Sequence, residues 1–337
     1  MKINSSDRSS LISIIERFPR QRIALLGDLV ADEFIYGEIA RVSREAPVLI
    51  LKQREKQIVP GGGANAANNL ADLGAAVTVT GVVGEDDAGE ALLRYFHERG
   101  ISARGVARLR GHQTPTKSRI LGGLSHWQRQ QIVRIDREPA QPLGREFRHR
   151  LSQSVARSLS KISALLLSDY GYGATDGREA AFLRQRAGHR ALPITVDSRF
   201  ALRSYAGITA ATPNEPEVEE AFGRRIGTDI DLLHRLGQEL LRRQKLQALL
   251  VTRGRDGMVL FERREKPRHL PIFGSDQAVD VTGAGDTVIA AFTLALAAGA
   301  SFLYAAMLAN AAGGLVVMKR GTATVTAHEL TEAIRNA

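Results

Sequence analysis

The sequence predicts an α/β fold, with one doubly wound sheet covered by helices on both faces. Short apolar runs of strand length recur along the chain, as expected for strands buried on both faces of a sheet. Helical patterns lie between most of these runs, and this alternation favours a doubly wound sheet. Two other stretches, residues 33–53 and 111–135, are rich in β-branched residues and have no helical period. We expect them to form a small antiparallel sheet that covers the ligand crevice as a lid.

The predicted elements follow one another in a regular order. After a short N-terminal helix, apolar runs predict strands at residues 22–28, 77–81, 164–168, 194–197 and 248–252. Amphipathic patterns predict helices at residues 86–98, 176–186 and 229–243, and small residues suggest two packed helices at 284–298 and 302–318. Because no linker, repeat or low-complexity segment interrupts this order, we expect a single domain over residues 1–337.

The composition is that of an ordinary globular protein, with 44% hydrophobic and 24% charged residues. No apolar run approaches the roughly 20 residues that a membrane-spanning helix needs. The chain has no cysteine, and its first residues lack the order of a secretory signal. We therefore expect a cytoplasmic protein without disulfides and without a membrane partner.

The formal net charge is +10, but the basic residues are dispersed. The densest basic cluster, residues 242–245, ends an amphipathic helix pattern, where solvated charges are common. We therefore do not expect nucleic-acid binding. A positive surface would instead concentrate phosphorylated small molecules near a cleft.

A string of small residues, Asp-Val-Thr-Gly-Ala-Gly-Asp at 280–286, precedes a strongly helical run. Its glycines should leave backbone N–H groups of the first helical turn open to an anion, which the helix dipole also attracts. Asp286 follows this pocket and can accept the proton of a hydroxyl that attacks a bound phosphate. Phosphoryl transfer needs both the donors and the base. A glycine-rich helix start alone leaves a plain turn or cap open as the simpler alternative.

Two glycine-rich strings carry a family resemblance. The string at 280–286 and Pro-Gly-Gly-Gly-Ala-Asn-Ala-Ala-Asn-Asn at 60–69 are similar to the two signatures of the ribokinase-like, or PfkB, carbohydrate kinases. The resemblance implies a ribokinase-like fold and an anion hole beside a catalytic base, at Gly283, Ala284, Gly285 and Asp286. The segment at 60–69 lacks the spacing of a dinucleotide fingerprint, so a Rossmann oxidoreductase is disfavoured.

The resemblance also implies a sugar site at the first strand and the first signature. Asp32 would accept hydrogen bonds from sugar hydroxyls, since an ionised carboxylate has acceptors only. Gly61, Gly62 and Asn65 would contact the sugar at the start of a helix. From the residues alone, Asp32 is equally a solvated loop residue, and Asn65 could simply cap a helix after a tight turn.

ATP and Mg²⁺ are the cofactors that the resemblance implies. Asn214 and Glu217 match the family's Asn-x-x-Glu motif, which helps to organise magnesium, its waters and the phosphates. The same two residues also fit a helix cap with an acidic first turn.

Less specific assignments complete the nucleotide site. They are Thr252, Gly254, Gly257, Thr282 and Asn310. Gly254 and Gly257 also suit a plain hairpin turn. Because family members often bind a monovalent cation through main-chain oxygens near positions 280, 282 and 321, potassium is a further candidate cofactor.

The resemblance is strongest to the heptose-7-phosphate kinase branch and runs from about residue 22 to about residue 329. It is carried by residues 37–48, 116–119, 134–136, 168–171 and 280–288. A phosphorylated sugar needs cations that form paired hydrogen bonds, and the lid supplies candidates. The lid residues assigned to this substrate are Arg41, Arg44, Lys117, Arg119, Arg134 and Asp136. For each cation, a solvated strand face is an equally good explanation.

This sequence departs from that branch at two places. Tyr172 stands where the branch has a lysine, and Asp-Ser-Arg-Phe at 197–200 replaces an Asp-Pro-Lys-Gly string. The sugar is therefore less well determined than the kinase activity. We do not expect the nucleotidyltransferase domain that is fused to some relatives, and since some relatives dimerise through the lid, we expect a homodimer.

The principal hypothesis is transfer of the ATP γ-phosphate to the anomeric hydroxyl of a heptose 7-phosphate, for nucleotide-activated heptose synthesis. Another PfkB-type kinase, acting on fructose, ribose, a nucleoside or a sugar phosphate, is the alternative enzyme. A sugar-sensing protein without turnover is the alternative outside enzymes. The complete string at 280–286 argues against it.

Overall fold

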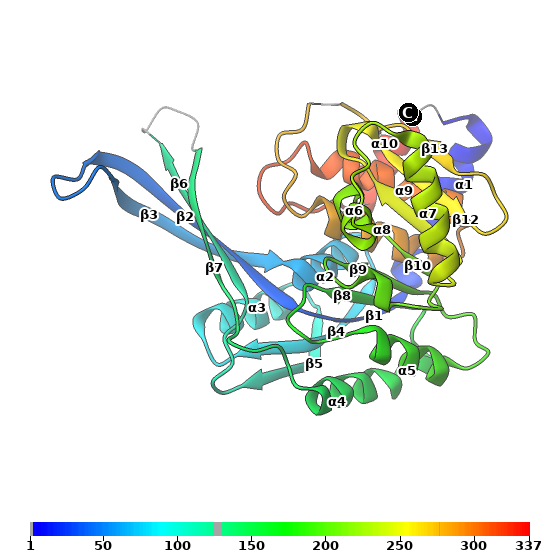
Figure 1. The fold of residues 1–337 in the computed structure, drawn as a ribbon, viewed down its shortest axis with the longest axis horizontal. Helices are drawn as coiled ribbons and strands as arrows, with labels where there is room; N and C mark the ends of the chain where they lie inside the picture. The colour runs from blue at the N-terminus through cyan, green and yellow to red at the C-terminus, as the bar shows by residue number, and fades with distance from the viewer. Residues whose placement is uncertain (1–2, 124–129, 276) are drawn as a thin grey trace.

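A computed structural model describes residues 3–123, 130–275 and 277–337 of the chain. It contains a nine-stranded main sheet and a four-stranded lid sheet that projects from one end of the body (Figure 1). In sheet order, the main strands are β13 (Arg268–Leu270), β12 (Met258–Glu262), β11 (Ala248–Thr252), β10 (Ala210–Ala211), β9 (Ile194–Ser198), β8 (Ala164–Asp169), β1 (Arg22–Gly27), β4 (Ala76–Gly84) and β5 (Ser102–Leu109). Strand β12 runs antiparallel to both of its neighbours, and the other pairs are parallel.

The central strands are apolar throughout because each of their faces belongs to a separate core. In β1, Ile23 and Leu25 pack into one hydrophobic cluster, while Ala24 and Leu26 pack into the other. Side chains alternate between the two faces of a strand, so a sheet with helices on both sides needs apolar residues at every position. This is why strand-length apolar runs predict the centre of the sheet well.

Ten helices of the described chain cover the two faces. The first face packs against α1 (Ser5–Ile15), α2 (Gly62–Asp72), α3 (Asp87–Glu98), α8 (Ala284–Ala297), α9 (Phe302–Val316) and α10 (Ala327–Arg335). The second face packs against α4 (Arg145–Ala156), α5 (Gly177–Ala187), α6 (Glu215–Phe222) and α7 (Ile230–Arg243). The predicted doubly wound architecture is confirmed.

The lid sheet has the strand order β3 (Leu49–Gly61), β2 (Leu29–Val42), β6 (Thr116–Gly123) and β7 (Gln130–Arg137). The predicted lid is present, but it is not wholly antiparallel, because β2 and β6 pair in parallel. The reason lies in their origins: β2 follows β1, and β6 follows β5, so both leave the main sheet at the carboxyl ends of parallel strands. Of the predicted excursion at 111–135, residues 124–129 lie outside the described residues.

One buried carboxylate joins all four lid strands on one face of the lid. Glu33 of β2 forms an ion pair of 2.7 Å with Lys56 of β3 and one of 2.8 Å with Arg137 of β7, and it accepts a hydrogen bond from the Ser118 hydroxyl of β6. Glu33 is only 3% exposed. A buried carboxylate with several partners fixes the relative positions of the strands that supply them.

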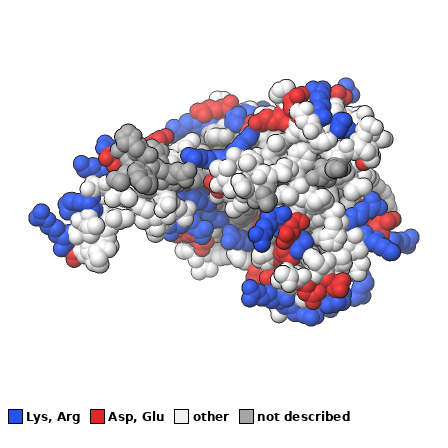
Figure 2. All heavy atoms as spheres, turned by 90° about the horizontal axis from the view of Figure 1, so that it is seen from above, with Lys and Arg blue, Asp and Glu red and all other residues white. Residues whose placement is uncertain are grey.

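No helix in the described part of the chain is long and apolar enough to cross a membrane. On the face shown in Figure 2, Lys and Arg side chains are scattered, with Asp and Glu side chains among them. This dispersal in space matches the dispersal of basic residues along the sequence.

Candidate active site

The string at 280–286 forms a tight loop that leads into α8. Gly283 has φ 77° and stands immediately before the helix, a left-handed conformation that favours glycine. Asp280 accepts hydrogen bonds of 2.9 Å from the N–H groups of Thr282 and Gly321. Although burial opposes them, these bonds hold the pKa of Asp280 below its ordinary value. These bonds fix the loop that precedes α8. At Gly285, an added side chain would face open space.

Asp286 lies in the first turn of α8 and is 4% exposed. Each of its carboxylate oxygens accepts one hydrogen bond of 2.8 Å, Oδ2 from Asn65 Nδ2 and Oδ1 from the Tyr170 hydroxyl. Burial raises the pKa of Asp286 to about 6, and the two hydrogen bonds limit the rise. A carboxylate with this pKa is ionised at neutral pH and still basic enough to take a proton.

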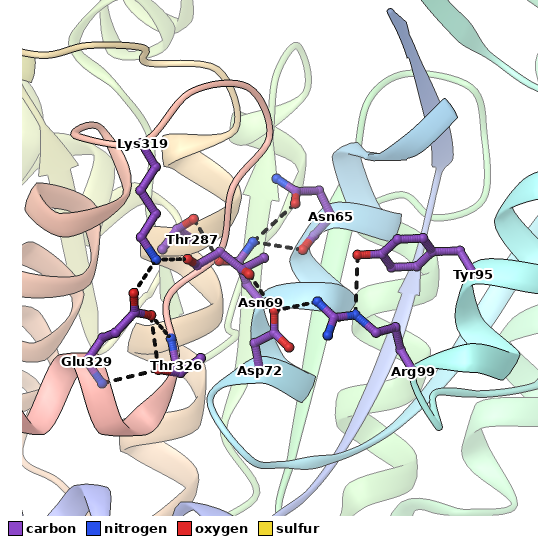
Figure 3. A network of polar contacts seen from close by, with 10 residues as sticks. Asn65, Asn69, Asp72, Tyr95, Arg99, Thr287, Lys319, Thr326 and Glu329 are labelled. Atoms are coloured by element: carbon purple, nitrogen blue, oxygen red, sulfur yellow. Dashed lines mark hydrogen bonds and ion pairs between the residues drawn. The ribbon is translucent and has the colours of Figure 1, made fainter. Parts of the chain in front are cut away.

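Asn65 is held in the orientation that donates to Asp286. Its Oδ1 accepts a hydrogen bond of 3.2 Å from Asn69 Nδ2, which also donates to the Asn65 carbonyl at 2.9 Å. Asn69 Oδ1 accepts in turn from the Thr287 hydroxyl at 2.8 Å. Figure 3 shows Asn65, Asn69 and Thr287 side by side between α2 and α8. Because Thr287 is the neighbour of Asp286 in the chain, these bonds form a closed ring that includes the Asp286 carboxylate.

A second set of polar contacts lies beside this one and extends toward the end of the chain. Asp72, at the end of α2, accepts hydrogen bonds from Arg99 Nη2 and from the Thr324 hydroxyl. Lys319 donates to the Thr324 carbonyl at 2.7 Å and to Glu329 at 2.6 Å (Figure 3). The loop between α9 and α10 is thereby attached to α2, the helix that carries Asn65.

The glycines of the first signature let backbone and side chains approach closely beside the predicted sugar residues. A Cβ atom on Gly61 would lie 2.7 Å from Asp32 Oδ2. Gly62 has φ 51°, and a Cβ atom there would lie 3.1 Å from the Tyr170 ring. A larger residue at position 61 would therefore displace Asp32, which the sequence assigned to the sugar. A larger residue at position 62 would displace Tyr170, which is bonded to the predicted base.

Several of the predicted sugar residues share one face of the lid. The register places Asp32, Lys117 and Asp136 in one row across β2, β6 and β7. Arg119 and Arg134 lie in the next row on the same face, because side chains alternate along each strand. Between the two rows, Arg119 Nη1 lies 2.5 Å from Asp32 Oδ1, and Arg134 forms two bonds of 2.9 Å with Asp136.

Burial changes the proton affinities on this face of the lid. It raises the pKa of Asp32 despite the nearby Arg119, and it lowers the pKa of Lys117. The charges of Asp32 and Lys117 both act on Asp286. This face of the lid is thus electrostatically connected to the predicted base.

Arg41 and Arg44 lie elsewhere in the lid. Arg41 is near the end of β2, and Arg44 is in the turn between β2 and β3 at the far tip of the hairpin (Figure 1). Both side chains are exposed. At about 3.3 Å per residue, Arg41 is about 30 Å along the strand from Asp32. The expectation that these two arginines join the other sugar residues is therefore not met within one chain, because a long strand separates them.

Four of the residues predicted to bind the nucleotide line one pocket at the N-terminus of α8, and Thr282 is not among its lining residues. Its walls include Thr252, Gly254, Gly257 and Asn310, and it has a volume of about 190 Å³. Ala284 and Gly285 of the predicted anion hole line the same pocket. Gly254 and Gly257 also form the turn between the antiparallel strands β11 and β12, so the turn interpretation holds beside the functional one.

Asn214 and Glu217 form a reciprocal cap at the start of α6. Glu217 N–H donates to Asn214 Oδ1 at 2.8 Å, and Asn214 N–H donates to Glu217 Oε2 at 2.9 Å. Burial raises the pKa of Glu217 to about 7. Burial also raises the pKa of Asp197 well above its ordinary value, and the nearby charges of Glu217 and Asp286 add to the effect. Among the described residues, no group of three or more His, Cys, Asp or Glu side chains is placed to hold a metal ion.

Sequence reasoning assigned no role to two residues that organise the site. Tyr170 donates to Asp286, and Asp28 accepts hydrogen bonds from the N–H groups of Tyr170, Tyr172 and Ala174 at 2.8, 3.0 and 2.8 Å. Burial raises the pKa of Asp28 to about 6 despite these three bonds. The only signal in the sequence was position, because both residues directly follow apolar strands at the end of the sheet where ligands bind.

Comparison with known proteins decides the family. Residues 22–329 match the pfkB family of carbohydrate kinases. The chain belongs to this family. It is therefore an ATP-dependent carbohydrate kinase, and the family and fold predicted from the two glycine-rich strings are confirmed.

The curated relatives of this pfkB kinase include longer proteins. Bifunctional protein HldE of Pelobacter propionicus is 39% identical over 330 residues, which are 97% of this chain and 66% of that protein. Bifunctional protein HldE of Coxiella burnetii, strain RSA 493, is 39% identical over 95% of this chain and 65% of its own length. The chain thus spans about two thirds of the length of these relatives.

Solved structures of other sugar kinases share the fold. Ribokinase of Arabidopsis thaliana, solved with ribose and ATP, has a TM-score of 0.72 at 20% identity, over 94% of this chain and 99% of that chain. Phosphofructokinase-2 of Escherichia coli, solved with potassium, has a TM-score of 0.72 at 19% identity, over 94% and 98% of the two chains. At this identity the likeness shows the common fold alone.

Proposed function

We propose that this pfkB kinase transfers the γ-phosphate of ATP to the anomeric hydroxyl of a heptose 7-phosphate and forms the 1,7-bisphosphate. The observation that carries the proposal is the position of Asp286. It lies between a lid face that holds Asp32 and Lys117 and a pocket that includes its neighbour Gly285. A base at this junction can contact a sugar on one side and a phosphoryl group on the other.

The transfer follows from these positions. Asp286 accepts the proton of the sugar hydroxyl, and the sugar oxygen forms a bond to the γ-phosphorus. The bond from that phosphorus to the bridging oxygen breaks, and ADP leaves with its electron pair. The N–H groups of Gly283, Ala284 and Gly285 at the start of α8 stabilise the charge that develops on the phosphoryl oxygens. The N–H of Ala284 also donates to the Val281 carbonyl at 3.2 Å.

The nucleotide and ion assignments belong to the same proposal. The apolar pocket beside Asn310 would take the adenine, and Thr252, Gly254 and Gly257 would border the nucleotide. The oxygens of Asn214 and Glu217 suit Mg²⁺, which is usually held by few protein ligands and several waters. When bound, Mg²⁺ supplies positive charge for the phosphates. The main-chain oxygens near Asp280, Thr282 and Gly321 are the candidate site for potassium.

The heptose phosphate is supported by the resemblance of the lid strings to the heptose-7-phosphate kinase branch. On the lid, Lys117, Arg119 and Arg134 are the cations that share a face with Asp32. Since phosphate recognition favours charged donors in pairs, this face suits the sugar phosphate. Arg41 and Arg44 are left out of the site of their own chain, and their contribution would require a second lid in the homodimer that we expect.

A different phosphorylated or free sugar is the second candidate, and one contact favours it. Tyr172, which stands in place of the branch's lysine, donates a hydrogen bond of 2.8 Å to Glu138 at the root of the lid. A neutral phenol bound to a carboxylate cannot supply the positive charge that a lysine would bring. The sugar selectivity could therefore differ from that of the branch.

An ATP-consumption screen over phosphorylated and free heptoses, hexoses, pentoses and nucleosides tests the proposal. We expect the highest kcat/KM with a heptose 7-phosphate. Good activity on another sugar, with none on any heptose phosphate, would contradict the substrate assignment. As a control for the base, Asp286→Asn should lower kcat about 10³-fold or more while ATP still binds by calorimetry.

A further inference from the structure

Tyr170 is half-buried at the centre of the candidate active site. Its hydroxyl donates to Asp286 Oδ1 at 2.8 Å, and its backbone N–H donates to Asp28 Oδ2 at 2.8 Å. Lys117 Nζ lies 5.1 Å from the centre of its ring on the lid side. On another side the ring packs against Gly62, where a Cβ atom would approach to 3.1 Å. Lys117 and Gly62 thus flank the ring whose hydroxyl donates to Asp286.

We propose that Tyr170 is a positioning residue for the base, whose hydroxyl orients the Asp286 carboxylate and stabilises its ionised form. The inference rests on the proposed role of Asp286 as the base. Its carrying observation is that the two donors are divided between the two oxygens, with Asn65 on Oδ2 and Tyr170 on Oδ1. Two donors on opposite oxygens fix the plane of a carboxylate, whereas a single donor leaves it free to rotate about the bond to Cβ.

The direction of the electrostatic effect follows from burial. Burial favours the neutral form of Asp286, and the hydrogen bonds from Asn65 and Tyr170 favour the charged form. Burial and the Asp286 charge raise the pKa of Tyr170 itself well above its ordinary value, so the phenol stays protonated and remains a donor. Loss of the hydroxyl should therefore raise the proton affinity of the base.

Tyr170→Phe isolates this effect, because phenylalanine retains the ring between Lys117 and Gly62 and removes only the hydroxyl. Tyr304→Phe is a matched control. The Tyr304 hydroxyl also donates to an aspartate, Asp7 Oδ1 at 2.9 Å, but it joins α9 to α1 away from Asp286. Comparison of the two variants therefore distinguishes the loss of any tyrosine–aspartate hydrogen bond from the loss of the bond at Asp286.

The first measurement is an NMR titration of the aspartate side-chain carboxyl carbons, with Asp286→Asn to assign the signal of Asp286. We expect the pKa of Asp286, about 6 in the wild type, to rise by about one unit in Tyr170→Phe, as when a carboxylate loses one of two hydrogen bonds. Tyr304→Phe should leave it unchanged. An unchanged pKa in Tyr170→Phe would overturn the proposal, and this result does not depend on which sugar is the substrate.

The second measurement is kcat/KM against pH, with whichever sugar the screen identifies. The acidic limb should move upward by about one pH unit in Tyr170→Phe and should not move in Tyr304→Phe. A loss of activity that is equal at every pH, with the limb in place, would show a merely structural role and overturn the proposal. If heptose 7-phosphate proves not to be a substrate while Asp286 still titrates as expected, the substrate assignment fails and the role of Tyr170 stands.

Discussion

Arg119 of β6 and Asp32 of β2 form an ion pair inside the lid, with Arg119 Nη1 2.5 Å from Asp32 Oδ1. The exposed fractions of their side chains are 13% and 7%. A largely buried pair is costly to break from one side, because the remaining charge has lost its partner. Asp32, the carboxylate that we propose binds the sugar, is therefore positioned by a cation of the same face before any substrate binds.

Arg119→Met should weaken sugar binding more than it slows the chemical step. Without Arg119, burial should raise the pKa of Asp32 further and leave it a poorer acceptor for sugar hydroxyls. We expect the KM for the sugar to rise about tenfold or more, which corresponds to about 1.4 kcal/mol. Arg54→Met is the control, because Arg54 pairs with Glu38 on the same sheet, where both side chains are exposed. Equal KM values in the two variants would contradict a role for the buried pair.

Magnesium dependence should vary with pH through Glu217. Burial raises the pKa of this carboxyl to about 7, so protons compete with Mg²⁺ below that pH. The apparent Mg²⁺ affinity in the ATPase-coupled assay should rise between pH 6 and pH 8. Glu217→Gln should lower the affinity and remove this pH dependence.

Glu329→Gln provides the matched control for that measurement. Thr326 and Glu329 form the same kind of reciprocal cap at the start of α10. Loss of the Thr326–Glu329 cap should lower the free energy of unfolding by about 1 kcal/mol and leave the Mg²⁺ requirement unchanged. If both variants change the Mg²⁺ requirement alike, Glu217 acts only as a helix cap.

Asp286→Asn should stabilise the protein, and more so at high pH. Folding raises the pKa of Asp286 from 3.8 to about 6. The folded state therefore binds this proton more tightly than the unfolded state, and stability decreases as pH rises through this interval. The increase in the free energy of unfolding that Asp286→Asn causes should be about 1.4 kcal/mol larger at pH 8 than at pH 5, as measured by urea unfolding. A gain that does not change with pH would contradict the raised pKa.

Sugar binding should protect the root of the lid from hydrogen exchange. The protected segments should be residues 29–36 and 116–119, where Asp32 and Lys117 face the base. The tip near Arg41 and Arg44 should be protected only if a second chain covers it. Light scattering would give the mass of the assembly in the same buffer. Exchange throughout 33–53 and 111–135 that saturating sugar leaves unchanged would argue against lid closure.

The centre of the fold could be predicted from the sequence because burial on two faces leaves a strong signal. The run at 22–28 is apolar for this reason, and it forms β1. Some elements without that constraint were not predicted. Helix α4 has a polar sequence with few buried residues, and β10 is only two residues long. The parallel pairing of β2 with β6 was also missed, since it depends on where β1 and β5 end in space.

The candidate site was predictable where glycines mark a backbone conformation or a close approach. Gly283 and Gly62 are examples, with φ values of 77° and 51°. Side-chain partners across long sequence separations could not be predicted. Tyr170 is 116 residues from Asp286 in the chain, and an aromatic residue after a buried strand is equally typical of a core. The pairing of Arg119 with Asp32 likewise depends on the register of two strands.

Asp28 stands between the last residue of β1, Gly27, and the first residue of β2, Leu29. Its carboxylate also holds three N–H groups of the loop that carries Tyr170. Asp28 therefore joins the start of β2, one of the two strands through which the lid leaves the main sheet, to the loop that carries Tyr170. We therefore expect the angle of the lid and the proton affinity of Asp286 to change together. A sugar that drew the lid inward would then act on the proposed base through the backbone as well as through its own hydroxyl.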